Sequence, residues 1–241
     1  MAIVFTFLSM LMTSGRDLFE KKSVSSKTEE VLKTLVWYGI FNAILLCAVL
    51  LFGMDGTSMM PHELLIKTPA AALPPILNYT FLFFALVAYK YVGVSVRNTF
   101  ANTDGLFFII LLVFYHFVTG NAQYATRLFT LPALIGLILI LGGGFIYPRL
   151  KGPQENESSS EVATAAQTSK SILILGILVS FTSAFFDGAE SMVSSVLIGD
   201  DVVDSIEYIA ATAMIQVIIT VFIWIYLSIS TQKPYNPFRK T

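Results

Sequence analysis

Cysteine and histidine are scarce in this chain, and their scarcity limits the chemistry that it can perform. The 241 residues include one cysteine, Cys47, and two histidines, His62 and His116. A single cysteine cannot form an intrachain disulfide. A lone histidine in an apolar span lacks the partner ligands that a metal site requires. The sequence therefore predicts no disulfide framework, no metal site and no cofactor.

Charged residues are also few. They make up 13% of the chain, whereas a soluble domain usually contains about 25%. Hydrophobic residues reach 55%, and the mean hydropathy is +0.73. A core of this size could not hide so much apolar sequence from water, so the composition predicts an integral membrane protein in contact with the lipid bilayer and excludes a nucleic-acid-binding protein. No basic segment and small-residue cleavage site mark a secretory leader, so we expect the first apolar run to be retained.

Long apolar runs are what the chain does contain. A hydrocarbon core about 30 Å thick requires about 20 apolar residues in a helix, and backbone groups inside it must hydrogen-bond within their own segment. The fold class that follows is an all-α polytopic membrane protein. Seven membrane-spanning helices are predicted: Ala2–Gly15, Thr34–Gly53, Leu73–Val92, Thr103–Val118, Leu131–Tyr147, Ile172–Ile198 and Tyr208–Ser228.

Two hydrophilic stretches interrupt these spans. Residues 149–170 are rich in Ser, Glu, Gln and Ala and lack aromatics, which predicts a flexible, solvated linker. The linker separates a first unit, residues 1–148, from a second unit, residues 171–241. The stretch Met54–Pro69, which contains His62, is interpreted as a surface connector.

Basic residues fall almost entirely on one side of the predicted membrane. When the polar segments are assigned alternately to two sides, one side carries only Lys67 and Arg127 of the fifteen basic residues. Basic residues near span ends stay in the cytoplasm. We therefore expect a multi-pass protein of the cell membrane, with the N-terminus outside and the loops after spans one, three, five and seven inside. Those loops hold Arg16, Lys21, Lys22, Lys27, Lys33, Lys90, Arg97, Arg149, Lys151, Lys170, Lys233, Arg239 and Lys240.

The chain also contains an internal repeat. The stretch TSGRDLFEKKSVSS, which begins at Thr13, returns as TSAFFDGAESMVSS, which begins at Thr182, with Thr, Ser, Val, Ser and Ser in the same positions. Five predicted spans separate the copies, and an odd number of spans inverts the second copy in the bilayer. Inverted repeats of this kind build many secondary transporters.

A longer stretch carries a family resemblance. From Ala85 to Tyr147 the sequence reads ALVAYKYVGVSVRNTFANTDGLFFIILLVFYHFVTGN, then a short link, then LPALIGLILILGGGFIY. An aromatic-rich turn after one span, a polar entry to the next and a Gly-rich fifth span resemble the EamA-like branch of the drug/metabolite transporter superfamily. The resemblance implies two five-helix repeats in opposite orientation and a carrier, not an enzyme, that moves a small organic solute by alternating access.

The sequence departs from that family pattern at three points. Members have about ten spans, so seven spans with an incomplete second repeat predict a fragment, or a chain that needs a homodimer or another partner to complete the bundle. The acidic residue usual near the end of the fourth span is replaced here by the run from His116 to Gly120. Members also commonly have both termini inside, whereas the charge distribution places the N-terminus outside.

Acidic residues within the sixth span are the leading functional candidates. Ser183, Asp187 and Ser191 recur every four residues and would form one polar stripe on a helix, with Glu190 beside them. Ionisable groups inside spans are costly and therefore suggest a substrate or proton-coupling role, which Asp187 fits best. The alternative is that the span ends before Asp187 and these residues begin a solvated loop. A neighbouring stripe of Ser180, Ala184 and Gly188 predicts close helix packing.

Four more polar residues are candidates for the opposite side of a cavity. Arg16 and Asp17 hold the matching place in the first copy of the repeat, although a charged helix end would also anchor topology at the interface. Asn98 and Asn102 lie four apart at the entry to the fourth span, where amides could bond a solute. The residues of this entry could also cap the helix, and Thr103 is the preferred cap.

Two other classes of function stay open at this stage. Asp200, Asp201 and Asp204 spell DDxxD, a pattern that holds Mg²⁺ on diphosphates in membrane prenyltransferases, because hard cations prefer carboxylate oxygens. No second acidic motif or basic clamp accompanies it. The other alternative is a membrane scaffold that binds a partner protein.

Overall fold

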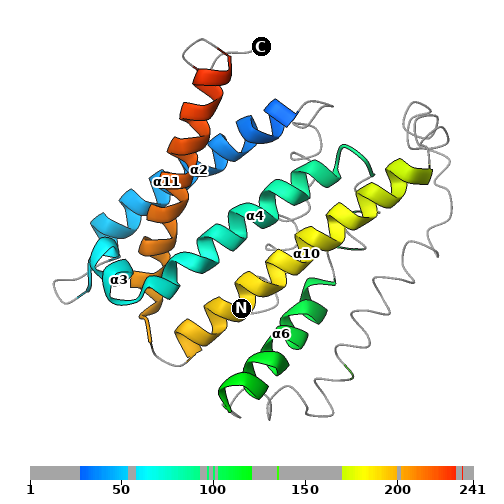
Figure 1. Ribbon diagram of the computed structural model, residues 1–241. Coiled ribbons are helices and arrows are strands. Elements are labelled where there is room, and N and C mark those ends of the chain that lie inside the picture. The colour runs from blue at the N-terminus through cyan, green and yellow to red at the C-terminus, as the bar shows by residue number, and fades with distance from the viewer. Residues whose placement is uncertain are drawn as a thin grey trace.

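The regular segments that the structure describes are all helical. The computed structural model describes residues 28–53, 58–92, 97, 100, 103–120, 135, 170–199, 202–231 and 235. Figure 1 shows α4, α10 and α6 lying side by side, whereas α2 crosses α11. The elements are α2 (Thr28–Phe52), α3 (Pro61–Lys67), the 3-10 helix η1 (Pro69–Ala72), α4 (Leu73–Ala88), α6 (Asp104–Thr119), α10 (Lys170–Gly199) and α11 (Ser205–Ser230).

Four of these segments are long and apolar enough to cross a membrane. They are Glu29–Phe52, Pro69–Ala88, Ile174–Gly199 and Ser205–Ser230, and they match the second, third, sixth and seventh predicted spans. The fourth predicted span is α6, which has 16 residues and a length of about 24 Å. The first and fifth predicted spans and the linker lie outside the described residues, except for helical positions 135 and 170. The helical fold class is confirmed for the described residues, which include four helices that could cross a membrane, and the count of seven spans stays a prediction.

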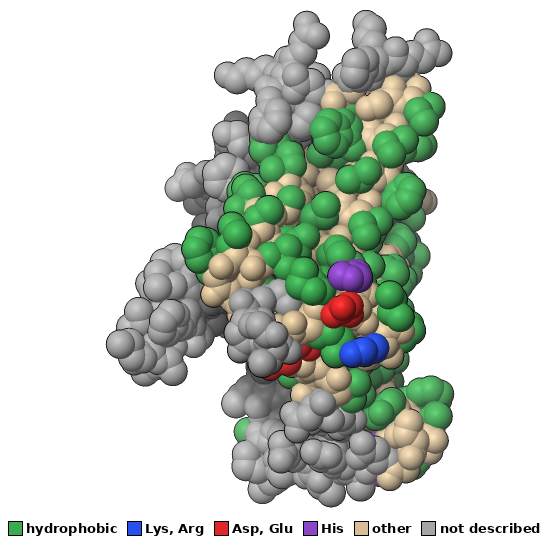
Figure 2. Space-filling view, turned by 90° about the vertical axis from the view of Figure 1, so that its left-hand side faces the viewer, with side chains coloured by type: hydrophobic (Ala, Val, Ile, Leu, Met, Phe, Trp, Pro, Cys, Tyr) green, Lys and Arg blue, Asp and Glu red, His purple; other side chains and the backbone are tan. Residues whose placement is uncertain are grey.

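The outer surface of the bundle is apolar. Phe41 of α2 is 65% exposed, Leu178 of α10 is 58% exposed and Phe222 of α11 is 68% exposed. Figure 2 shows one face on which hydrophobic side chains dominate and the few charged ones lie together in the lower half. Leaving such side chains in water costs about 25 cal/mol for each Å² of apolar surface. The exterior is therefore suited to contact with lipid.

The interior joins helices that are distant in sequence. One core cluster packs Val31 and Leu35 of α2 against the residues of α4 between Tyr79 and Leu86. A second cluster brings α3 and η1 together with the end of α10 and the start of α11. Its buried members are Leu64, Ala71, Leu197, Val203, Tyr208 and Ala211.

Small residues bring α10 close to its neighbours, as its sequence predicts. Ser180 and Ala184 are each 1% exposed. A Cβ added at Gly188 would lie 2.6 Å from the carbonyl oxygen of Asp104 and 2.8 Å from Phe107 Cβ, at the start of α6. A Cβ at Gly176 would collide with Val92 and lie 2.9 Å from Tyr91 Cβ. Close backbone approach at both ends of this stripe fixes the position of α10 between α4 and α6.

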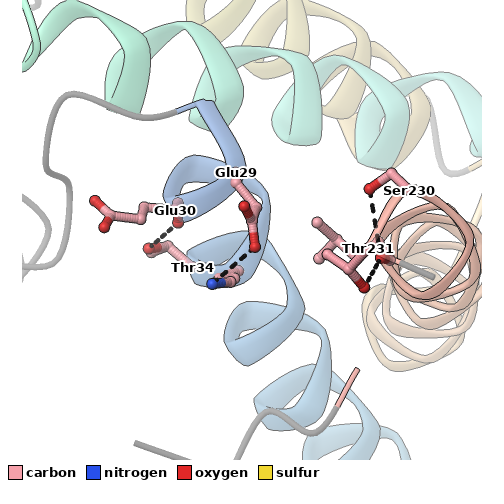
Figure 3. A network of polar contacts seen from close by, with 7 residues as sticks. Glu29, Glu30, Thr34, Ser230 and Thr231 are labelled. Atoms are coloured by element: carbon pink, nitrogen blue, oxygen red, sulfur yellow. Dashed lines mark hydrogen bonds and ion pairs between the residues drawn. The ribbon is translucent and has the colours of Figure 1, made fainter. Parts of the chain in front are cut away.

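One end of the bundle, here the basic end, gathers the start of α2 and the segment after α11. Lys33 Nζ lies 2.9 Å from Glu29 Oε1 and 5.8 Å from the centre of the Tyr235 ring. Figure 3 shows Glu29, Glu30 and Thr34 of α2 across from Ser230 and Thr231 at the end of α11. The Tyr235 backbone is held to α11, because Trp224 Nε1 donates to its carbonyl oxygen over 2.8 Å.

The segment after α4 reaches the same basic end. Burial lowers the pKa of Lys90, and the nearby Glu30 carboxylate partly opposes this by raising it. The charge of Lys90 is therefore close to the start of α2. The polar segments before α2, after α4 and after α11 thus meet at one end of the bundle. The alternating assignment of polar segments places these three on the same side of the membrane, in agreement with their common location.

The opposite end, here the α3 end, is covered by a short helix that the sequence analysis did not anticipate. The stretch Met54–Pro69 was interpreted as a surface connector, but α3 and η1 pack on α11, and Leu64 is only 2% exposed. Met59 N donates to Glu207 Oε1 over 2.5 Å, which ties this segment to the start of α11. Leu64 is buried by tertiary contacts, in a cluster with residues of η1, α10 and α11, so local hydropathy could not reveal its burial.

Candidate functional site

The acidic residues of the sixth span lie within a continuous helix. α10 runs without a break from Lys170 to Gly199, so Asp187 and Glu190 lie in a helix and do not begin a loop. Asp187, Glu190 and Ser191 are half-buried. Helical spacing places Ser183, Asp187, Glu190, Ser191 and Ser194 on one side of α10. These five residues, together with Tyr208 of α11, are called the polar seam below.

Glu190 is the best-connected member of the polar seam. The Ser194 hydroxyl donates to Glu190 Oε1 over 2.9 Å, and Ser191 also hydrogen-bonds the Glu190 carboxyl group. Ser194 Oγ in turn lies 2.5 Å from the hydroxyl oxygen of Tyr208. The chain of contacts thus connects α10 to the start of α11. An ionisable group held by hydroxyls inside a spanning helix is a functional candidate, because its burial is costly.

Ser183 has a structural role. It is 1% exposed, and its hydroxyl donates over 3.3 Å to the backbone carbonyl oxygen of Phe81 in α4. Asp187 lies one helical turn away, half-buried, at the level between Ser183 and Ser191. The sequence pattern favours Asp187 as the main functional residue, whereas the hydrogen bonds described in the polar seam centre on Glu190.

A second polar cluster joins three helices and was missed by the sequence analysis. The hydroxyl oxygens of Tyr79 in α4 and Thr220 in α11 lie 2.7 Å apart, and Asn42 of α2 also hydrogen-bonds Tyr79. Gln216 Nε2 of α11 donates to Asn78 Oδ1 of α4 over 3.2 Å. Thr220 and Gln216 are 5% and 7% exposed. Amide side chains in otherwise apolar spans are the signal that could have found it.

Arg97 is the other residue whose position the sequence did not anticipate. It was counted among the basic residues of a polar loop, but it is 3% exposed. Its guanidinium carbon lies 5.9 Å from the ring centre of Phe81 and 5.3 Å from that of Tyr89. Aromatic faces attract a guanidinium group, and more strongly when water is excluded. The cation is therefore held against α4 by two aromatic rings.

Of the remaining candidate residues, Asp204 and Thr103 lie within the described ranges. Asp204 is described, and it caps α11, because its side chain accepts a hydrogen bond from Ile206 N over 2.8 Å. Among the residues that the structure describes, no three His, Cys, Asp or Glu side chains form a group that could hold a metal ion. Thr103 precedes α6, but the prediction that its side chain caps this helix is wrong, because its hydroxyl accepts no hydrogen bond from the first turn and instead donates to the Phe100 carbonyl oxygen. The predicted site residues that lie outside the described ranges are Arg16, Asp17, Asn98, Asn102, Asp200 and Asp201.

Comparison with known proteins adds no relative. No protein-family model matches the chain, and neither a curated protein nor a solved structure matches it. The candidate function therefore depends on the residues and geometry described above.

Proposed function

We propose that this chain is a secondary carrier of the EamA-like drug/metabolite type, which moves a small organic solute across the cell membrane by alternating access. The observation that carries the proposal is Glu190, an acidic side chain half-buried inside a candidate spanning helix and bonded to hydroxyls from its own helix and, through Ser194, to α11. Placing a carboxyl group inside a spanning helix is costly and does not stabilise the protein. Its presence there is therefore better explained by a function.

The internal repeat supports the same proposal. Ser183 and Ser194 both belong to the second copy of the repeated stretch, which therefore contributes the core of the polar seam. If helices one and two are equivalent to helices six and seven, then α2 and α11 are a pair related by the repeat. These two helices pack against each other, as a pair close to an in-plane symmetry axis would. Rocking of the two units around the seam is the motion that inverted repeats permit.

The proposal is tested by solute flux in liposomes. The purified full chain is reconstituted, and accumulation by counterflow is measured for a panel of amino acids, nucleosides and cationic drugs. We expect one class to accumulate, and Glu190→Gln to slow it by about tenfold or more, as the loss of an interaction of about 1.4 kcal/mol would. Accumulation of no class, or an unchanged rate in Glu190→Gln, contradicts the proposal.

Glu63→Gln is the matched control for this experiment. Glu63 is exposed on α3, and its Oε2 accepts a hydrogen bond from Met60 N over 3.3 Å. Glutamine can accept the same bond at this position. The control therefore removes one carboxylate at the α3 end without changing the polar seam, and its transport rate should match that of the unsubstituted protein.

A further inference from the structure

The hydrogen bonds of the polar seam have a defined direction. Ser194 Oγ donates its only hydrogen to Glu190 Oε1, and Ser194 and Tyr208 also share a hydrogen bond. Because a serine hydroxyl has one hydrogen, Tyr208 must be the donor to Ser194 in this arrangement. The three side chains therefore form a chain in which every hydrogen points toward Glu190.

This chain runs from the end of the bundle into its interior. Tyr208 is in the first turn of α11, directly after Glu207, which binds Met59 N at the α3 end. Tyr208 keeps 8% of its surface exposed. Glu190 precedes the last residue of α10 by nine positions, which is about 14 Å along the helix axis. The path therefore connects the region near the α3 end with an interior carboxyl group.

The surroundings of Glu190 allow both of its protonation states. Within the described residues its partners are hydroxyls, and it forms no ion pair. Hydroxyls can donate to a carboxylate and can accept from a protonated carboxyl group. Besides Glu190, the titratable side chains described on α10 and on the elements packed near it are Asp187, Tyr79 of α4, Asp104, Tyr115 and His116 of α6, and Glu207, Tyr208 and Tyr226 of α11.

We propose that Tyr208, Ser194 and Glu190 form a proton path through which Glu190 exchanges a proton with the α3 side of the membrane. In one transfer, Ser194 passes its hydroxyl hydrogen to Glu190 Oε1, Tyr208 passes its own to Ser194, and a hydronium ion on the α3 side passes a proton to Tyr208 and becomes water. The carboxylate gains one proton, both hydroxyl groups are restored, and no atom is oxidised or reduced. The inference rests on the proposed carrier function, in which a protonatable interior site couples proton and solute movement.

Infrared difference spectroscopy of the full chain in liposomes tests the path without any solute. Acidification should produce the carbonyl band of a protonated carboxyl group, which disappears in Glu190→Gln and persists in Glu63→Gln. When the buffer is changed to heavy water, the deuterium shift of this band should be slowed about tenfold or more in Tyr208→Phe. Tyr226→Phe is the control, because Tyr226 is 60% exposed on α11, and its exchange rate should be unchanged.

Two results would overturn the proton path. One is the same band in Glu190→Gln, and the other is exchange at the original rate in Tyr208→Phe. If Glu190→Gln does not fold, Glu190→Asp replaces it, and a band at an unshifted frequency in that variant also overturns the path.

The spectroscopic test separates this inference from the carrier function. A chain that passes it but moves no solute keeps the proton path and loses the carrier function. A chain that moves solute but fails it keeps the carrier function and loses the proton path.

Discussion

Gly39 sets how closely α2 can approach α11. A Cβ added at Gly39 would collide with the Thr220 side chain, whereas a Cβ added at Gly105 of α6 would meet nothing within 4 Å. Gly39 thus lies directly at the contact between the two helices, where small residues permit close approach. Thr220 is also the residue through which Tyr79 of α4 reaches α11, so the contact joins three helices.

Gly39→Ala should therefore destabilise the bundle. Overpacking of a close contact lowers the free energy of unfolding by about 1–3 kcal/mol. Gly105→Ala should leave it unchanged or raise it by up to about 1 kcal/mol, because alanine is favoured over glycine inside a helix. Steric-trap unfolding in bicelles measures both. Equal stability of the two variants would show that α2 and α11 do not pack at Gly39.

Tyr79→Phe should weaken the same contact through its hydroxyl group. Thr220 Oγ1 donates to the Gln216 carbonyl oxygen over 2.8 Å, so Tyr79 must donate to Thr220. Hydrogen bonds between membrane helices contribute about 0.6 kcal/mol on average and up to about 1.7 kcal/mol. We expect a loss of that size in the free energy of unfolding. Tyr226→Phe, at a 60% exposed position, should cause none, and an equal loss in both variants would assign no role to the Tyr79 hydroxyl.

At the level of elements, α3 should contribute to stability although it has only seven residues. Leu64 is 2% exposed against α11, whereas Ile66 on the same helix is 77% exposed. Leu64→Ala should lower the free energy of unfolding by about 2–5 kcal/mol, as other buried leucine truncations do. Ile66→Ala, measured in the same unfolding experiment, should have little effect. If the two truncations cost the same, α3 is not docked on α11.

The long helices were predictable from the sequence, and their ends were less so. The apolar window Ile172–Ile198 matches α10 within two residues at its start and one at its end. α2 begins at Thr28, six residues before the predicted span, because Glu29 and Glu30 continue the helix beyond its apolar part. α11 begins at Ser205, directly after its cap Asp204. Hydropathy locates the lipid-embedded part of a helix, while capping and hydrogen bonding decide where it ends.

The candidate site was predictable only in part, for a similar reason. Glu190 and Ser191 could be identified from their spacing on one helix. Tyr208 could not, because its contact with Ser194 depends on how α11 returns beside α10. The same is true of Arg97, whose aromatic partners are Phe81 of α4 and Tyr89, the residue directly after it. Contacts between helices leave no periodic pattern in a single sequence.

At the level of the whole molecule, the two ends of the bundle should face opposite compartments. Ser230 lies at the basic end and Glu63 at the α3 end, and both are exposed. Basic residues near span ends stay in the cytoplasm. With Cys47→Ser as background, a membrane-impermeant maleimide should label Glu63→Cys on intact cells and Ser230→Cys only after permeabilisation. The reverse pattern would invert the orientation, and labelling of both on intact cells would contradict a spanning arrangement.

Alternating access is the central claim, and paired distance measurements test it most directly. Spin labels on Glu29→Cys and Ser230→Cys report on the basic end, and labels on Glu63→Cys and Ser205→Cys report on the α3 end. Double electron–electron resonance should find two distance populations at each end. Conditions that lengthen one distance should shorten the other. A single unchanging distance at both ends, or lengthening at both ends together, would contradict the account.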